Sequence, residues 1–189
     1  MPDHLLDLAV MLRAEADLQE QVLMSRLAGR LGYVAVHLPL PASGVVDPAL
    51  VERLIEAAEP AMVVVDDGGE NPGIVRRNDP LLVAAARAAL DAAEDSRPLV
   101  VAVPLSIGRT YNEAVARADR DPRFVDDAHP QASGIFGTFE QAQEQVLALA
   151  HAGAEVLLVT LPYELDIADL LAQVKALVVG ATPALFQQN

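Results

Sequence analysis

Residues 134–162 read GIFGTFEQAQEQVLALAHAGAEVLLVTLP, and this stretch predicts one strand–helix–strand unit. A short apolar run over 133–136 precedes Thr138 and Gln141, which have the spacing of a helix capping box. The apolar residues of the helix recur along one side, at Ala142, Val146, Leu149 and Ala150. Residues 155–161 then form a continuous apolar run, which is typical of a strand covered on both faces in a parallel sheet.

The rest of the chain repeats this alternation of apolar runs and capped helices. Further strands are expected at 5–12, 33–38, 61–66 and 99–105, and further helices are expected to begin at Asp17, Asp47, Asp79, Thr110 and Asp166. The segments 67–78 and 120–132 are predicted to be loops. We expect a single α/β domain over residues 1–179 and a loose tail over 180–189. Six strand–helix pairs fall short of the eight pairs and about 250 residues of a TIM barrel, so counting alone favours an open doubly wound sheet.

Composition excludes several classes of function. The chain has 189 residues and a formal net charge of −14, so it repels DNA and anionic membranes, and we expect neither as a partner. It has no cysteine, which excludes disulfides, thiolate metal sites and a cysteine nucleophile. No apolar run approaches the roughly 20 residues of a membrane span, and the first residues do not resemble a signal peptide. We therefore expect a cytoplasmic protein.

Several polar residues lie where predicted strands end, which is where parallel α/β folds gather their ligands. His37 could donate a proton or a hydrogen bond to a ligand, or it could be a buried structural histidine. Asp66 and Asp67 could hold a divalent cation, or they could close a turn. Spacing fixes no third carboxylate beside them, so we expect no metal site. Thr160 and Tyr163, at the end of the last strand, could line a pocket.

The loop before the Thr110 helix is the best candidate for an anion site. Ser106, Gly108, Arg109 and Thr110 lead into a helix N-terminus, where free backbone N–H groups and the helix dipole favour phosphate or carboxylate. Arg109 would add a charged donor. The alternative is an ordinary helix cap made by Thr110, with Arg109 in solvent.

Three segments resemble the luciferase-like family of flavin- or F420-dependent oxidoreductases and monooxygenases. They are SRLAGRLGYVAVHL at 25–38, VAVPLSIGRTYNEAVARA at 101–118 and the unit at 136–161. The resemblance implies a TIM barrel that holds FMN or F420 at the carboxyl ends of its strands. In such a barrel the strand-end and helix-start residues Ser106, Gly108, Arg109, Thr110, Asp66 and Thr160 are the candidate cofactor contacts, and His37 is the catalytic candidate.

The chain also departs from the family pattern. It is much shorter than typical members, and it has Pro-Leu-Pro-Ala at 39–42 where members often place an acidic–histidine cluster. We therefore expect a shortened barrel of about six strand–helix units, and two functions remain open. One is a flavin- or F420-dependent oxidoreductase, and the other is a non-catalytic accessory or ligand-binding relative. An incomplete barrel must cover its edge strands, so we expect a homodimer or a complex with a full-length homologue.

Overall fold

The computed structural model describes residues 5–13, 16–41, 43–66, 69, 71–124, 133–161 and 166–179. Asp67, Tyr163 and the expected tail over 180–189 lie outside the described residues. The strands are β1 (Asp7–Met11), β2 (Ala35–Pro39), β3 (Met62–Asp66), β4 (Ile74–Val75), β5 (Val100–Ile107), β6 (Ile135–Gly137) and β7 (Val156–Thr160). The helices are α1 (Leu18–Leu31), α2 (Pro48–Ala58), α3 (Pro80–Ala92), α4 (Tyr111–Ala118), α6 (Phe139–His151) and α7 (Ile167–Val179), with a short 3-10 turn at Pro122–Phe124.

The capping signals in the sequence mark the helix starts correctly. The expected cap residues accept hydrogen bonds from first-turn backbone N–H groups, and they are Asp17, Asp47, Asp79, Thr110, Thr138 and Asp166. Thr138 and Gln141 form the full capping box. The strands begin and end within about two residues of the predicted runs, as is usual for element boundaries. The exception is β4, which lies in a segment predicted to be a loop.

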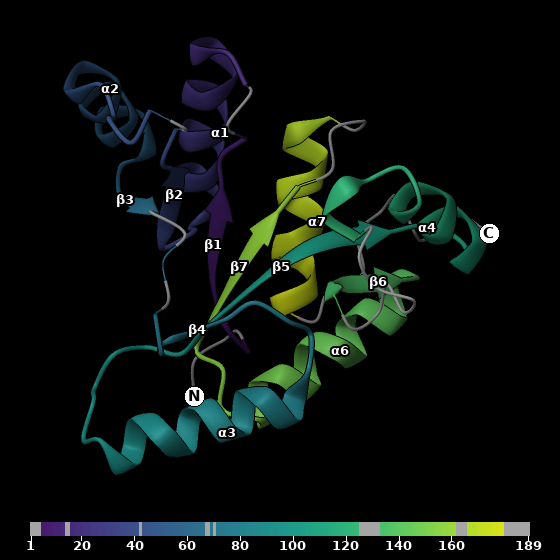
Figure 1. Cartoon of the computed structure of the whole chain (residues 1–189). Coiled ribbons are helices and arrows are strands. Elements are labelled where there is room, and N and C mark those ends of the chain that lie inside the picture. Colours follow the sequence, from purple (N-terminus) through teal and green to yellow (C-terminus); the bar gives the residue numbers. More distant parts are fainter. Residues whose placement is uncertain are drawn as a thin grey trace.

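All strand pairs are parallel, and the order is β3-β2-β1-β7-β5-β4, with β6 paired to the end of β5 (Figure 1). The first long strand, β1, therefore lies between β2 and the last strand, β7. This pairing of first and last strands is the arrangement of a barrel. The strand path ends at β3 and β4, which share no ladder. The two edges nevertheless approach, because Arg76, directly after β4, reaches Asp66 at the end of β3, with Nη2 and Oδ1 3.5 Å apart.

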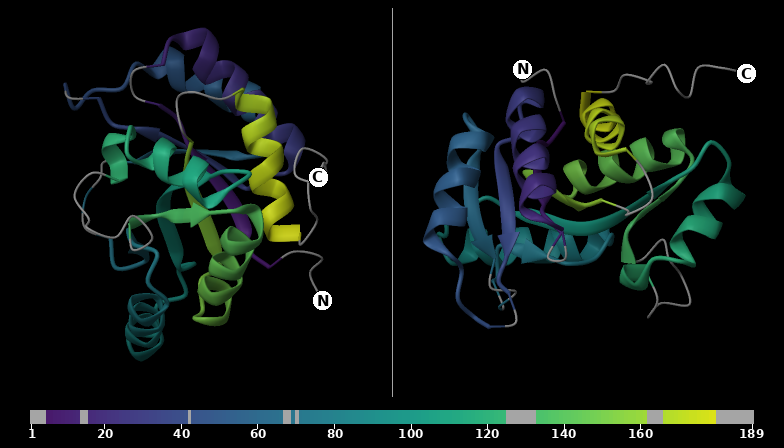
Figure 2. Two further views of the ribbon diagram at one scale, coloured as in Figure 1. Left: turned by 90° about the vertical axis from the view of Figure 1, so that its right-hand side faces the viewer. Right: turned by 90° about the horizontal axis from the view of Figure 1, so that it is seen from above.

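Five helices form one layer on the outer face of this sheet (Figure 2), while α4 packs on Ser106 of β5 and Phe136 of β6 at the inner face. Neighbouring helices contact each other in the order α2-α1-α7-α6-α3, which follows the order of the strands. The main core lies between this layer and the sheet. A smaller cluster, built on Ala9, Ala35 and Leu158, fills the inner face of the sheet. A continuous layer of helices along one face is typical of a barrel, whereas a doubly wound sheet carries such layers on both faces.

The buried face of α1 differs in part from what the sequence predicts, which is a stripe of Val22, Leu23, Leu27 and Leu31. Val22, Leu27 and Leu31 pack, half-buried, against the core, but the fully buried side chains include Met24 and Ala28, and Leu23 is 46% exposed. The reason is that α1 packs closely against α2 on one side and α7 on the other. A Cβ atom on Gly29 would lie 2.2 Å from the carbonyl oxygen of Ala58, so glycine is what allows α1 and α2 to approach. Small residues of α1 therefore face the neighbouring helices, and part of the leucine stripe lies at the edge of these helix contacts.

Candidate functional site

The inner face of the sheet carries a layer with two polar side chains, His37 and Thr160, near the carboxyl ends of the strands. Met11 is in register with His37 of β2 on one side and with Thr160 of β7 on the other. Thr160 is in turn in register with Pro104 of β5. Residues in register on parallel strands point to the same face, so these four side chains share one layer. The layer beneath consists of the small or apolar residues Ala9, Ala35, Ala102 and Leu158.

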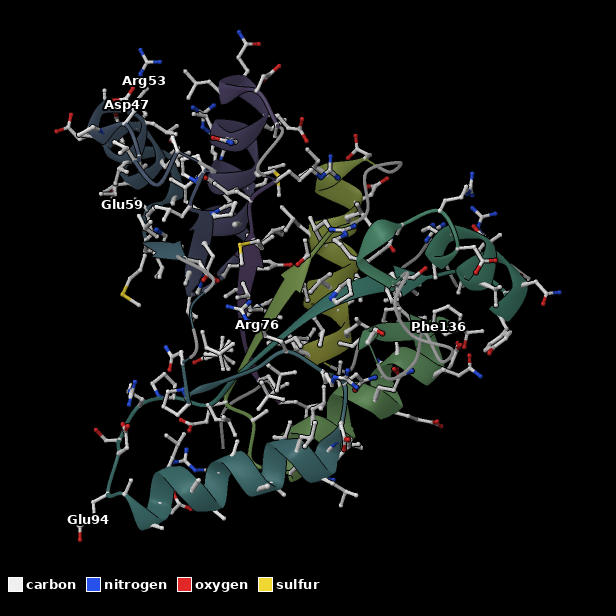
Figure 3. All side chains as sticks on the ribbon, in the orientation of Figure 1. Asp47, Arg53, Glu59, Arg76, Glu94 and Phe136 are labelled. Carbon is white, nitrogen blue, oxygen red and sulfur yellow. The ribbon has the colours of Figure 1, made fainter. Side chains whose placement is uncertain are left out.

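A pocket of about 320 Å³ opens over these two layers. Its floor comes from three strands, through Met11 of β1, Ala102, Val103 and Pro104 of β5, and Leu158 and Thr160 of β7. Its walls carry Arg76, Arg77, Arg123 and Ser133. Three guanidinium groups over an apolar floor make a site suited to a flat ligand with an anionic group. Figure 3 shows Arg76 over the strands and not among the outer helices.

His37, Asp66 and Arg76 form a polar row beside this pocket. His37 Nδ1 lies 3.8 Å from Asp66 Oδ2, and Asp66 Oδ1 lies 3.5 Å from Arg76 Nη2. The side chains of His37 and Asp66 are only 11% and 8% exposed. Burial lowers the pKa of His37, and the nearby Asp66 carboxylate only partly opposes this. His37 is therefore a neutral imidazole at pH 7, able to donate from one ring nitrogen and accept at the other.

The third arginine of the pocket is held by its own loop. Arg123 Nε donates to Asp121 Oδ1 at 2.7 Å, and its Nη2 contacts Asp121 Oδ2. Its Nη1 donates to the carbonyl oxygen of Leu161, directly after β7, at 2.8 Å. These bonds fix the guanidinium at the carboxyl end of the barrel before any ligand binds.

The residues expected at the anion site lie outside this pocket. Ser106 is buried and donates to the carbonyl oxygen of Ala114 at 2.9 Å. The backbone N–H of Arg109 donates to the Glu113 carboxylate, and Thr110 Oγ1 accepts from the N–H of Glu113. A Cβ on Gly108 would meet the backbone N of Ala114 at 2.6 Å, so glycine permits close packing there. The loop is therefore an ordinary helix cap, in which the Glu113 carboxylate accepts the hydrogen bond that an external anion would otherwise accept from the Arg109 N–H.

The structure thus brings His37, Asp66 and Thr160 together and leaves the loop over 106–110 apart from them. Sequence reasoning missed Arg76, Arg77 and Arg123. All three lie in segments predicted to be loops, where no periodicity shows which way a side chain points. The one available signal was the Arg-Arg pair directly after the apolar pair Ile74–Val75.

The described part of the chain contains neither a cluster of metal ligands nor a membrane-spanning helix. No group of three or more histidine, cysteine or acidic side chains within the described ranges could hold a metal ion. None of the helices described here is long and apolar enough to cross a membrane.

Comparisons with known proteins place the fold. No protein-family model and no curated protein matches the sequence. The structure is similar to the coenzyme F420-dependent tetrahydromethanopterin reductase of Methanopyrus kandleri, with a TM-score of 0.71 and 9% identity, over 93% of this chain and 99% of that one. It is also similar to apo-MsnO8, with a TM-score of 0.59 and 15% identity, over 94% of this chain and 99% of that one. Both are luciferase-like proteins. The chain therefore has the α/β barrel fold of the luciferase-like proteins.

Proposed function

We propose that this protein is a luciferase-like oxidoreductase that binds a flavin-type cofactor, FMN or F420, in the pocket at the carboxyl end of the barrel. The observation that carries the proposal is the meeting of Arg76, Arg77 and Arg123 over an apolar floor at the end of the barrel where such folds bind ligands. One of the two structural relatives is itself named for dependence on F420.

The residues present fit such a cofactor. Ala102, Leu158 and Pro104 offer a smooth floor for a flat ring system, and the arginines offer bidentate donors for phosphate or carboxylate groups. Thr160 adds a hydroxyl at the edge of that floor. The bound cofactor would supply hydride chemistry, while the chain would orient the ring and limit the access of water.

The size of the pocket limits how the cofactor would bind. Ligand sites usually enclose about 300–1,000 Å³, so a pocket of about 320 Å³ lies at the lower end. It matches a ring system better than a whole cofactor with its side chain. We therefore expect the anionic part to lie at the rim, against Arg76 and Arg77.

The test is a thermal-shift and fluorescence titration of the whole chain with FMN and with F420. A ligand that binds only the folded state raises the melting temperature, and the rise grows with the logarithm of its concentration above Kd. We expect a saturable fluorescence change and a rise in melting temperature with one of the two, lost in Ala102→Leu, which fills the floor, and weakened in the double variant Arg76→Gln/Arg77→Gln. Ala85→Leu, on the exposed side of α3, and Arg97→Gln/Arg120→Gln are the matched controls. No response to either cofactor would contradict the proposal.

A second candidate is a non-catalytic relative that binds the same kind of ligand. Leu38, Pro39, Leu40 and Pro41 follow His37 and offer no acid or base there, and His37 itself is buried beside Asp66. A stopped-flow mixture with the reduced cofactor separates the two functions. Saturable binding without any effect on the rate of cofactor oxidation, across a panel of candidate acceptors, would favour the non-catalytic relative.

We also propose that the protein is cytoplasmic and that its β3 edge is covered by a second copy or by a longer homologue. Met62 and Val65 of this strand are 65% and 43% exposed, which supports a covered edge. Light scattering of the purified chain tests the homodimer. If the chain is a monomer at high concentration but still binds a longer homologue, the homodimer is wrong and the complex with the homologue remains.

A further inference from the structure

A groove between α1 and α2 lies outside the barrel. It encloses about 690 Å³ and is lined by Leu18, Gln19, Val22, Arg26 and Arg30 of α1 and by Arg53, Glu56, Ala57 and Glu59 at α2. On α1 the lining follows one face, because Leu18, Val22, Arg26 and Arg30 are each four residues apart. The groove therefore runs along about 18 Å of helix, at about 1.5 Å per residue.

The arginines of this groove differ from most others in the molecule. Arg26, Arg30 and Arg53 make no hydrogen bond or ion pair with any residue in the described ranges. Elsewhere, arginine side chains reach carboxylates, as at Arg13, Arg76, Arg87, Arg97, Arg117 and Arg123. Figure 3 shows Arg53 extending away from the sheet.

The groove is lined by three arginines, whereas the chain as a whole is strongly negative. The whole chain has a net charge of −14, and only 13 of its residues are lysine or arginine. Two like charges four residues apart on one helix, as at Arg26 and Arg30, destabilise that helix slightly. Glu56 and Glu59 lie at the same groove and do not reach the arginines within ion-pair distance. The three guanidinium groups are therefore available to an anion from outside the chain.

The shape of the groove favours a protein segment over a small molecule. Most of its lining is exposed, including Leu18 at 39%, and only Val22 and Ala57 are half-buried. Small ligands usually lie in sites that bury most of their surface, whereas helical segments bind in long open grooves. The net charge of −14 disfavours a long polyanion such as nucleic acid as the source of the anionic groups. Leu18, Val22 and Ala57 supply the apolar strip that an amphipathic helix needs.

We propose that the α1–α2 groove binds an acidic amphipathic segment of a partner protein, with its carboxylates on Arg26, Arg30 and Arg53 and its apolar side chains on Leu18, Val22 and Ala57. The cofactor pocket takes no part in this binding. Glu56 and Glu59 repel acidic groups at one side of the groove and so favour one orientation of the segment.

The experiment uses the full chain and a fluorescently labelled 14-residue peptide of leucine and glutamate placed at helical spacing. We expect saturable binding by anisotropy, which weakens as salt is raised because the contacts are exposed ion pairs. Arg26→Glu/Arg30→Glu should weaken binding at least tenfold, as should Arg53→Glu on the other helix. Arg97→Glu/Arg120→Glu makes the same change in net charge elsewhere on the surface and should leave binding unchanged. The melting temperature of each variant checks that it folds.

Three results would overturn the inference. They are the absence of saturable binding, equal binding of a peptide with lysine in place of glutamate, and equal loss in the control variant. Inorganic tripolyphosphate serves as a competing probe. If it alone binds in an Arg26- and Arg30-dependent way, the groove is a phosphate site and the protein-segment proposal is wrong. Loss of FMN or F420 binding in the same variants would show that the two sites are not independent.

Discussion

Gly29→Ala tests whether the close crossing of α1 and α2 is set by the absence of a side chain. A methyl group at this position would lie 2.2 Å from the Ala58 carbonyl oxygen and 2.9 Å from the Glu59 carbonyl oxygen. Both are backbone atoms, so no side-chain rotation relieves the contact. The helices must separate instead, and the apolar residues beside the crossing lose part of their packing.

Two effects of opposite sign decide the outcome. Alanine is favoured over glycine inside a helix by about 1 kcal/mol. Overpacking of a tight contact costs about 1–3 kcal/mol, and a contact with backbone lies at the upper end of that range. We therefore expect Gly29→Ala to lower the free energy of unfolding by about 1–2 kcal/mol. At about 2–4 °C per kcal/mol for a chain of this size, the melting temperature should fall by about 2–8 °C.

Urea denaturation followed by circular dichroism measures this change. Ala85→Gly, on the exposed side of α3, gives the helix-propensity effect alone and should destabilise by about 1 kcal/mol. If Gly29→Ala were as stable as the parent or more so, propensity would outweigh the contact. The explanation of the crossing, and of the buried face of α1, would then be refuted.

Three further predictions concern buried polar groups and caps. Burial lowers the pKa of His37 below its ordinary 6.5, so the unfolded chain takes up a proton as the pH falls through about 6.5 while the folded chain resists it. The free energy of unfolding should therefore fall as the pH is lowered below that value. Urea melts of His37→Gln should show a smaller fall over the same pH range, and an equal dependence on pH in the parent and the variant would contradict this. Tyr33→Phe leaves the Leu171 carbonyl oxygen without its 2.9 Å donor and should cost about 1–3 kcal/mol in the same assay, whereas a neutral change would mean that water replaces the hydroxyl. Thr138→Ala removes an N-cap and should cost about 0.5–2 kcal/mol, with Thr138→Ser largely restoring the parent stability.

The fold was predictable where the sequence carries local signals. Asp47 and Asp79, each followed by proline, begin helices as expected, and the unit over 134–162 forms β6, α6 and β7. These features depend on hydrogen bonds between residues two or three apart, which a sequence shows directly. The pairing of β1 with β7 depends on residues about 150 positions apart, and only the family resemblance predicted it.

The site was less predictable for the same reason. His37, Asp66 and Thr160 could be placed at strand ends, because continuous apolar runs locate those ends. Arg76 and Arg123 reach the pocket through β4 and a 3-10 turn, which are too short to give a period in the sequence. The interpretation of Arg109 as an anion ligand overlooked Glu113, four residues on, which accepts from the backbone at the same helix end.

The gap between β3 and β4 has a consequence for the order in which backbone amides exchange with deuterium. β1, β7 and β5 each have a neighbouring strand on both sides, whereas β3 has one, and two residues of β4 pair with β5. The side-chain contact between Arg76 and Asp66 bridges that gap. The edges can therefore open without breaking the centre of the sheet, and such local opening needs less free energy than global unfolding. Amides of β3 and β4 should exchange first and those of β7 last. The pocket beside the gap should undergo local opening more often than the rest of the described structure.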